Sequence, residues 1–130
     1  MTISADFDMW VRLAKDYDTG FIADKLIQLR DHEGQLSRNE NYYINHVKED
    51  LTVYRNLLSY VESEIRSEGK LLLRNHKLLF YYTLMIKTFL KGNFKIGYSF
   101  YKELSGFDNF FKLTISFVRN KLFKHAYPDF

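Results

Sequence analysis

The feature that most constrains this fold is a stripe of apolar residues between positions 47 and 65. Its members are spaced alternately four and three positions apart: Val47, Leu51, Tyr54, Leu58, Val61 and Ile65. That spacing keeps every member on one face of an α-helix. It predicts one long helix from about residue 40 to residue 67. A chain with 10 Tyr, 12 Phe and a single Pro favours long helices over a turn-rich all-β fold.

The helical pattern continues to the end of the chain. A second stripe runs through residues 71–91 and comprises Leu72, Leu79, Tyr82, Ile86 and Phe89. We interpret residues 68–70, which include Gly69, as the break between the two long helices. Gly92 predicts a glycine C-cap for the second helix. Two shorter helices are expected over residues 94–104 and 108–125, separated near Gly106.

The N-terminal part has a different pattern. Residues 6–17 predict a helix in which Phe7, Trp10, Val11 and Ala14 share a face, with Ser4 as N-cap. Residues 21–23 and 26–29 predict two short strands, and residues 31–41 a loop. The expected fold class is therefore mostly α with a small β element (α+β). In this expected fold, a short helix and a hairpin-like pair of strands come first, and a bundle of about four helices follows. We expect a domain boundary between residues 1–38 and residues 39–130.

Composition excludes several classes of site. The absence of Cys removes disulfides, thiolate zinc sites and thiol nucleophiles, and it fits a reducing compartment. No apolar segment reaches the roughly 20 residues that a membrane-spanning helix needs. The acidic N-terminus lacks the apolar core of a signal peptide. We therefore expect a cytoplasmic location, with the inner face of the membrane as the alternative.

The charge is unevenly distributed along the chain. Residues 1–65 hold 7 basic and 12 acidic residues, whereas residues 66–130 hold 12 basic and 4 acidic residues. Basic residues among Leu, Phe and Tyr could lie on anionic lipid, or they could form an ordinary solvated face. We expect no nucleic-acid binding, because no helix-turn-helix spacing or RNP-like motif is present. His46, His76 and His125 are scattered along predicted helices, and we expect no metal role for them.

Two N-terminal motifs resemble a known family. Residues 6–13, Asp-Phe-Asp-Met-Trp-Val-Arg-Leu, resemble the Glu-Asp-x-Asp-Leu-Trp-x-Arg-Leu pattern near the end of the catalytic domain of family 2 glycosyltransferases, the inverting enzymes with a GT-A fold. Residues 20–37 resemble the strand that follows in that family, with its Arg-x-His and a loop serine. The resemblance covers about residues 3–38, and the two motifs occur in the family's order and spacing.

The resemblance implies a role for each residue of the first motif. Asp6 matches the family's general base, which takes the proton of the acceptor hydroxyl as it attacks the anomeric carbon. Asp8 would orient the acceptor or brace the helix, and Trp10 and Arg12 would fix the helix against the sheet. From the residues alone, Asp6 and Asp8 could instead compensate the helix dipole, and Trp10 could be a core residue.

The second motif implies the donor side of the site. Arg30 and His32 match groups near the nucleotide diphosphate, and Ser37 matches a loop hydroxyl over the site. A solvated loop remains the alternative for Arg30 and His32. The family's Mg or Mn ion would be held by an upstream Asp-x-Asp, so we expect no metal site within this chain, with His32 as the one candidate ligand.

The resemblance implies a C-terminal fragment of a transferase that moves a sugar from a nucleotide-diphosphate donor to a glycan, lipid-linked or protein-linked acceptor. Ala5 stands where the family has Glu, and Leu29 where it has Tyr. The nucleotide-binding half is absent from these residues, so we expect the fragment alone to be inactive and to self-associate through exposed apolar surface. The alternative is a stand-alone helical interaction module that associates with an anionic membrane surface.

Overall fold

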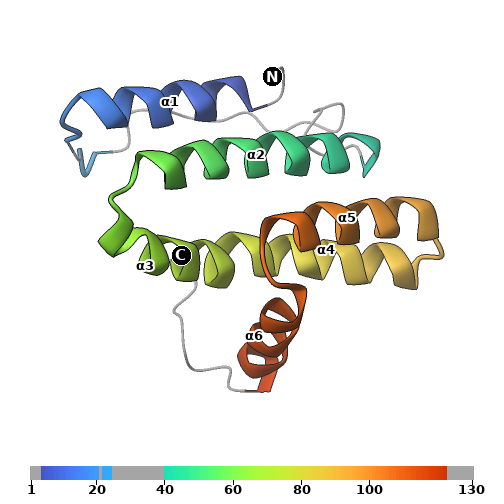
Figure 1. The fold of residues 1–130 in the computed structure, drawn as a ribbon. Coiled ribbons are helices and arrows are strands. Elements are labelled where there is room, and N and C mark those ends of the chain that lie inside the picture. The colour runs from blue at the N-terminus through green and yellow to red at the C-terminus, as the bar shows by residue number, and fades with distance from the viewer. Residues whose placement is uncertain (1–3, 21, 25–39, 123–130) are drawn as a thin grey trace. The chain divides into compact units, whose positions relative to one another are not determined.

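The computed structural model describes residues 4–20, 22–24 and 40–122, except for the side chains of residues 40, 41 and 122 (Figure 1). The chain divides into two compact units, Met1–Tyr60 and Val61–Phe130. This division after residue 60 separates two groups of residues that each pack mainly within themselves. The predicted boundary near residue 38 lies outside the described residues and stays a prediction.

The described helices of the first unit are α1 (Ala5–Asp16) and α2 (Glu40–Tyr60), which lie side by side in Figure 1. Near the start of α1, the Phe7 ring meets the Tyr54 ring edge-on with centroids 5.1 Å apart. Near its end, the Lys15 ammonium lies 5.0 Å from the Tyr60 ring centroid. The contacts advance in the same direction along both helices, so α1 and α2 run parallel.

The apolar stripe of α2 is confirmed, but its predicted length is wrong. Val47, Leu51, Tyr54 and Leu58 are all buried. The helix ends at Tyr60, and Glu62 has an extended ψ of 147° before the next helix begins at Ser63. The stripe spacing continues across this break to Ile65, which is exposed. Periodicity alone could not show the break, because both helices kept the same spacing.

The second unit is built on a nearly continuous helical rod. It comprises α3 (Ser63–Leu73), the π-helical turn η2 (Arg74–Leu78) and α4 (Leu79–Leu90). The break predicted at residues 68–70 is wrong, because Gly69 lies inside α3, where a glycine costs only about 1 kcal/mol relative to alanine. The predicted stripe is buried only in its later part: Leu79 and Tyr82 are buried, whereas Leu72 is exposed and α3 has no buried residue.

A tight hairpin joins α4 to α5 (Phe94–Phe107), and the two helices lie side by side (Figure 1). Gly92 has a φ of +81°, which confirms the predicted glycine C-cap. The Gly106 stop is wrong, because α5 continues to Phe107. Gly97 is buried against the ring of Phe89, which allows the two helices to approach closely.

The final described helix, α6 (Phe110–Leu122), leaves α5 at a steep angle in Figure 1. The Asn109 side chain caps it by accepting a hydrogen bond from the Lys112 N–H at 3.1 Å. Its inner face packs on Tyr82, whose ring lies 5.5 Å from that of Phe110 and whose hydroxyl lies 3.1 Å from the Thr114 hydroxyl. Leu113 is fully buried beneath this contact.

The expected β element is wrong where the structure tests it. Ile22 and Ala23 are not in a strand, and Ile22 is 64% exposed. A strand needs a neighbour to pair its backbone groups, and the described residues, which are helical apart from turns and connections, supply none. The second predicted strand, residues 26–29, lies outside the described residues. Within the described ranges, no helix is both long and apolar enough to cross a bilayer.

Candidate functional site

The first candidate site is the outward face of α1. Asp6, Met9, Trp10 and Leu13 lie within about 100° of one another around the helix, and all four are exposed. Trp10 is 63% exposed, so it is not a core residue of this chain. The residues of the predicted face therefore differ in burial, because Val11 is buried and Phe7 half-buried, whereas Trp10 and Ala14 are exposed. This leaves a carboxylate at the head of an open apolar stripe.

A buried polar cluster fixes the start of α1 on α2. The Ser4 hydroxyl donates a 2.5 Å hydrogen bond to Asp50 Oδ1, and the Ser4 backbone N–H donates to Glu49 Oε2 at 2.9 Å. Ser4 occupies the predicted N-cap position, but its side chain does not cap α1. Since Ser4 and Asp50 are both nearly fully buried, the cluster sets the position of the helix that carries Asp6.

The same cluster includes His46, which sequence reasoning had not connected to any carboxylate. His46 Nδ1 lies 3.2 Å from Asp50 Oδ2, one helical turn away. The order is serine–carboxylate–histidine, so the Ser4 hydroxyl donates to the carboxylate. A nucleophilic serine would instead donate to an imidazole that takes its proton. The cluster therefore holds α1 in place and is not a hydrolytic triad. The signal in the sequence was the four-residue spacing of His46 and Asp50.

Asp8 and Arg12 form a second pair along α1. Arg12 Nη2 lies 3.2 Å from Asp8 Oδ2, and the Asp8 side chain is largely covered while Arg12 is mostly exposed. An ion pair at this spacing stabilises a helix by a few tenths of a kcal/mol. The geometry suits the bracing role considered for Asp8.

Asp6 differs from Asp8 in having no such neighbour. It lies in the first turn of α1, where the helix dipole favours a negative charge. Across the part of the chain that the structure describes, it has no hydrogen-bond or ion-pair partner. An exposed and unpaired carboxylate, fixed at a helix start, can accept a proton from a hydroxyl group that approaches the open face.

The other predicted site residues cannot be placed. Arg30, His32 and Ser37 lie outside the described residues, so the structure neither joins them to Asp6 nor separates them from it. Among the residues that are described, no group of three or more His, Asp or Glu side chains could hold a metal ion. The expected Mg or Mn ion therefore has no ligand set in this part of the chain.

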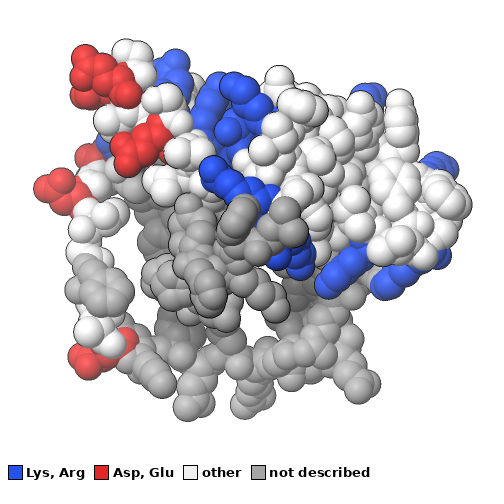
Figure 2. Space-filling model, turned by 90° about the horizontal axis from the view of Figure 1, so that it is seen from below, with Lys and Arg blue, Asp and Glu red and all other residues white. Residues whose placement is uncertain are grey.

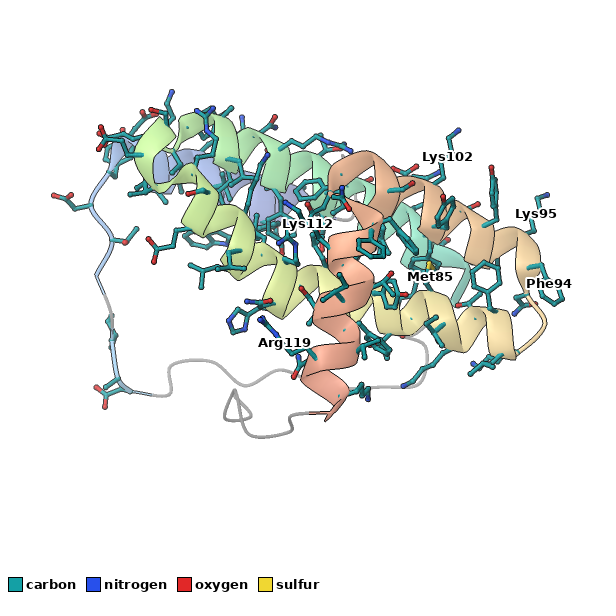
Figure 3. All side chains as sticks on the ribbon, turned by 60° about the horizontal axis from the view of Figure 1, so that its bottom comes forward. Met85, Phe94, Lys95, Lys102, Lys112 and Arg119 are labelled. Carbon is teal, nitrogen blue, oxygen red and sulfur yellow. The ribbon has the colours of Figure 1, made fainter. Side chains whose placement is uncertain are left out.

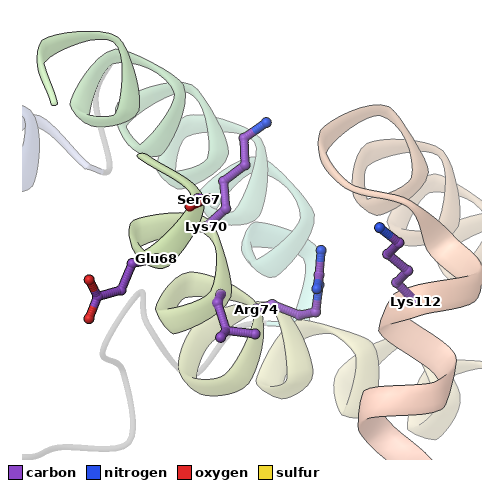
Figure 4. Close-up of a pocket in the computed structure, with 6 residues that line it drawn as sticks. Ser67, Glu68, Lys70, Arg74 and Lys112 are labelled. Carbon is purple, nitrogen blue, oxygen red and sulfur yellow. The ribbon is translucent and has the colours of Figure 1, made fainter. Parts of the chain in front are cut away.

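The second unit carries an open pocket of about 550 Å³ that sequence reasoning missed. It is lined by Ser67, Glu68, Lys70, Leu71, Arg74 and Lys112. In Figure 4, Lys112 extends from α6 toward Arg74, while Glu68 points away. No sequence motif marked this pocket, because its walls come from α3, η2 and α6.

The guanidinium in this pocket is already paired. Arg74 Nε and Nη2 donate to the two Asp108 carboxylate oxygens at 2.6 and 2.9 Å. Burial alone would raise the pKa of Asp108, but the hydrogen bonds from Arg74 and from the Asn109 N–H, with the charges of Arg74 and Lys70, lower it below its ordinary value. The same hydrogen bond raises the pKa of Arg74. Arg74 therefore joins η2 to the start of α6, and Lys70 and Lys112 are left as the cations facing the pocket.

The outward face of α1 is thus the site with a geometry suited to chemistry, and the pocket is a cationic hollow beside a structural ion pair. Comparison with known proteins adds no assignment, since no protein-family model, no curated protein and no solved structure matches this chain.

Proposed function

We propose that this chain is the C-terminal part of a family 2 glycosyltransferase, in which the outward face of α1 closes against a nucleotide-binding half contributed by other residues. The observation that carries the proposal is that, among the described residues, α1 packs through one side and leaves Trp10 exposed. Ser4 and Phe7 fix the helix to α2, whereas Trp10, on the neighbouring side, is 63% exposed. Tryptophan is usually at least half-buried in folded proteins, so an exposed one beside Met9 and Leu13 suits an interface.

The chemistry assigned to this chain is proton transfer at Asp6. As the acceptor oxygen attacks the anomeric carbon from the face opposite the leaving group, Asp6 takes the hydroxyl proton. The bond from that carbon to the nucleotide diphosphate breaks with its electron pair, and the configuration inverts. A divalent ion held by the other half would neutralise charge on the departing diphosphate. Asp8, paired with Arg12, braces the helix, and Arg30, His32 and Ser37 are proposed for the donor side.

Two experiments test this function. The first reads the coding sequence upstream of residue 1, where the proposal expects about 200 residues of alternating strands and helices, the scale of one domain, with an Asp-x-Asp motif. The second compares Asp6→Asn with Asp16→Asn in that longer protein, since both carboxylates are exposed on α1. Sugar transfer should fall about 10²- to 10⁴-fold for Asp6→Asn only, with donor binding unchanged.

The outcomes separate the two functions under consideration. Retained transfer in Asp6→Asn would remove the base assignment while leaving the enzyme class open. The absence of any upstream coding segment would contradict the enzyme proposal as a whole. That result would favour the stand-alone helical interaction module, for which α1 would be a docking helix without chemistry.

A further inference from the structure

The outer face of α6 carries an apolar stripe that is exposed in the part of the second unit that the structure describes. The inner face of the helix packs through Phe110, Leu113 and Phe117. On the opposite face, Phe111, Ile115 and Val118 are spaced four and three positions apart, and all are exposed, Phe111 to 73%. The helix is therefore apolar on two sides, and one of them packs against other described residues while the second is exposed.

Cationic side chains border this stripe on both sides. At about 100° per residue, Lys112 and Arg119 lie along one edge of the stripe. Lys121 lies beyond the other edge, where its ammonium is 5.9 Å from the centroid of the inner-face Phe117 ring. Figure 3 shows Lys112 and Arg119 on the same side of α6. No residue of α6 is acidic. Lys and Arg can bury their hydrocarbon stems along an apolar layer while their charged ends reach a polar one.

The surroundings of α6 indicate the charge of its partner. Between residues 69 and 122 the sequence has only two acidic residues, Glu103 and Asp108, and Asp108 is neutralised by Arg74. The same segment holds ten basic residues: Lys70, Arg74, Lys77, Lys87, Lys91, Lys95, Lys102, Lys112, Arg119 and Lys121. Figure 2 shows basic side chains interspersed with uncharged ones, while the acidic side chains of the visible face gather at its left edge. A complementary partner must therefore be anionic.

The partner must also offer an apolar layer beneath its negative charge. Nucleic acid supplies phosphates but no such layer for Phe111, Ile115 and Val118. The interface of an anionic phospholipid membrane supplies both, with phosphates above and acyl chains below. We propose that α6 lies in the plane of an anionic membrane surface, with its apolar stripe among the acyl chains and Lys112, Arg119 and Lys121 at the phosphates.

This inference is independent of glycosyl transfer, because it uses no residue of the first unit. Its first test measures insertion depth. In a Trp10→Phe background, which removes the single tryptophan, a reporter is introduced as Phe111→Trp or as Leu90→Trp. Leu90 is the matched control, because it is 82% exposed and lies at the far end of the α4–α5 hairpin, beside Lys91.

Vesicles of equal parts phosphatidylglycerol and phosphatidylcholine are compared with vesicles of phosphatidylcholine alone. Only the Phe111→Trp fluorescence should shift to the blue and be quenched by brominated acyl chains, and only with the anionic vesicles. Quenching of Leu90→Trp without quenching of Phe111→Trp would overturn the proposal in favour of the hairpin end. A lack of binding to the anionic vesicles at low salt would overturn membrane association itself.

The second test asks whether vesicle binding depends on the basic residues beside the α6 stripe or on the total positive charge of the unit. Lys112→Gln with Arg119→Gln removes two charges at the stripe, and Lys95→Gln with Lys102→Gln removes two charges from α5. Each basic residue at an anionic leaflet contributes on the order of fivefold to binding, so the first pair should weaken vesicle binding about 30-fold. The α5 pair should weaken it less than fivefold. Equal losses in two variants of unchanged helicity would overturn the assignment to α6.

Discussion

Two glycines of α5 provide a matched test of how closely α4 and α5 pack. A Cβ atom built at Gly97 would lie 2.9 Å from two ring atoms of Phe89, closer than real side-chain carbons approach. A Cβ atom at Gly106, nine residues later in the same helix, would meet nothing within 4 Å. Gly97→Ala and Gly106→Ala therefore add the same methyl group to the same helix, and only at Gly97 does that group meet another side chain.

The expected magnitudes follow from this difference. Replacing glycine by alanine in a helix stabilises a protein by about 0.5–1 kcal/mol. At Gly106 nothing opposes that gain. At Gly97 the Phe89 ring must move within a packed hairpin, and overpacking of that kind costs about 1–3 kcal/mol. Gly97→Ala should therefore lower the free energy of unfolding by up to about 2 kcal/mol, while Gly106→Ala raises it.

Urea unfolding followed by far-UV circular dichroism measures both variants. Tryptophan fluorescence would miss the effect, because the single tryptophan, Trp10, belongs to the first unit. The variants should change the transition of the second unit in opposite directions. Equal stabilisation by both substitutions would refute the close approach of α5 to Phe89.

Three further predictions follow from single contacts. Asp108→Asn should lower the free energy of unfolding by about 1–3 kcal/mol at neutral pH, because it breaks a two-fold, charge-assisted contact with Arg74. Because the pKa of Asp108 is lowered in the folded state, this stabilisation is complete above the unfolded-state pKa of about 4 and is lost as the pH falls through the folded-state pKa. Urea unfolding of both proteins across an acid pH series measures this loss. A difference in the free energy of unfolding that stays constant with pH would contradict it. Ser4→Ala should cost about 1–3 kcal/mol and speed hydrogen exchange in α1, since Asp50 loses a buried donor; unchanged exchange there would contradict the anchoring role. The isolated chain should self-associate through the exposed face of α1. In sedimentation velocity, the double substitution Trp10→Lys with Leu13→Lys should shift the chain toward monomer, whereas the control Phe94→Lys with Tyr98→Lys should not. A wild-type chain that is monomeric at high concentration would contradict this prediction.

The helices of this fold were predictable because their apolar spacing is strong, but their ends were not. The stripe through Val47, Leu51, Tyr54 and Leu58 identified α2 and its buried face. The break after Tyr60 carried only weak signals: Ser63 and Glu64 are typical of a helix start, but the uninterrupted spacing to Ile65 outweighed them. Gly69 was interpreted as a stop, although a single glycine is too small a penalty to end a packed helix.

Register and tertiary pairing were beyond sequence reasoning. The π turn at Arg74–Leu78 interrupts the α-helical pattern between α3 and α4, and no residue type marks such a turn. The Arg74–Asp108 and Ser4–Asp50 contacts join positions 34 and 46 residues apart. For the candidate site, the position of Asp6 at a helix start was predictable from its capping pattern. The exposure of Trp10 was not, because an apolar periodicity does not say which side finds a partner.

The proposed function requires that residues upstream of this chain cover the outward face of α1. Hydroxyl-radical footprinting with mass spectrometry measures this directly, because Met9 and Trp10 are reactive side chains that are both exposed in this chain. The rates for Met9 and Trp10 are compared between the isolated chain and a protein extended by its upstream coding sequence, with exposed Tyr98 in the second unit as the internal reference. We expect strong protection of Met9 and Trp10 in the longer protein, with the Tyr98 rate unchanged. Equal rates for Met9 and Trp10 in the two proteins would show that this face stays open, against the proposed function.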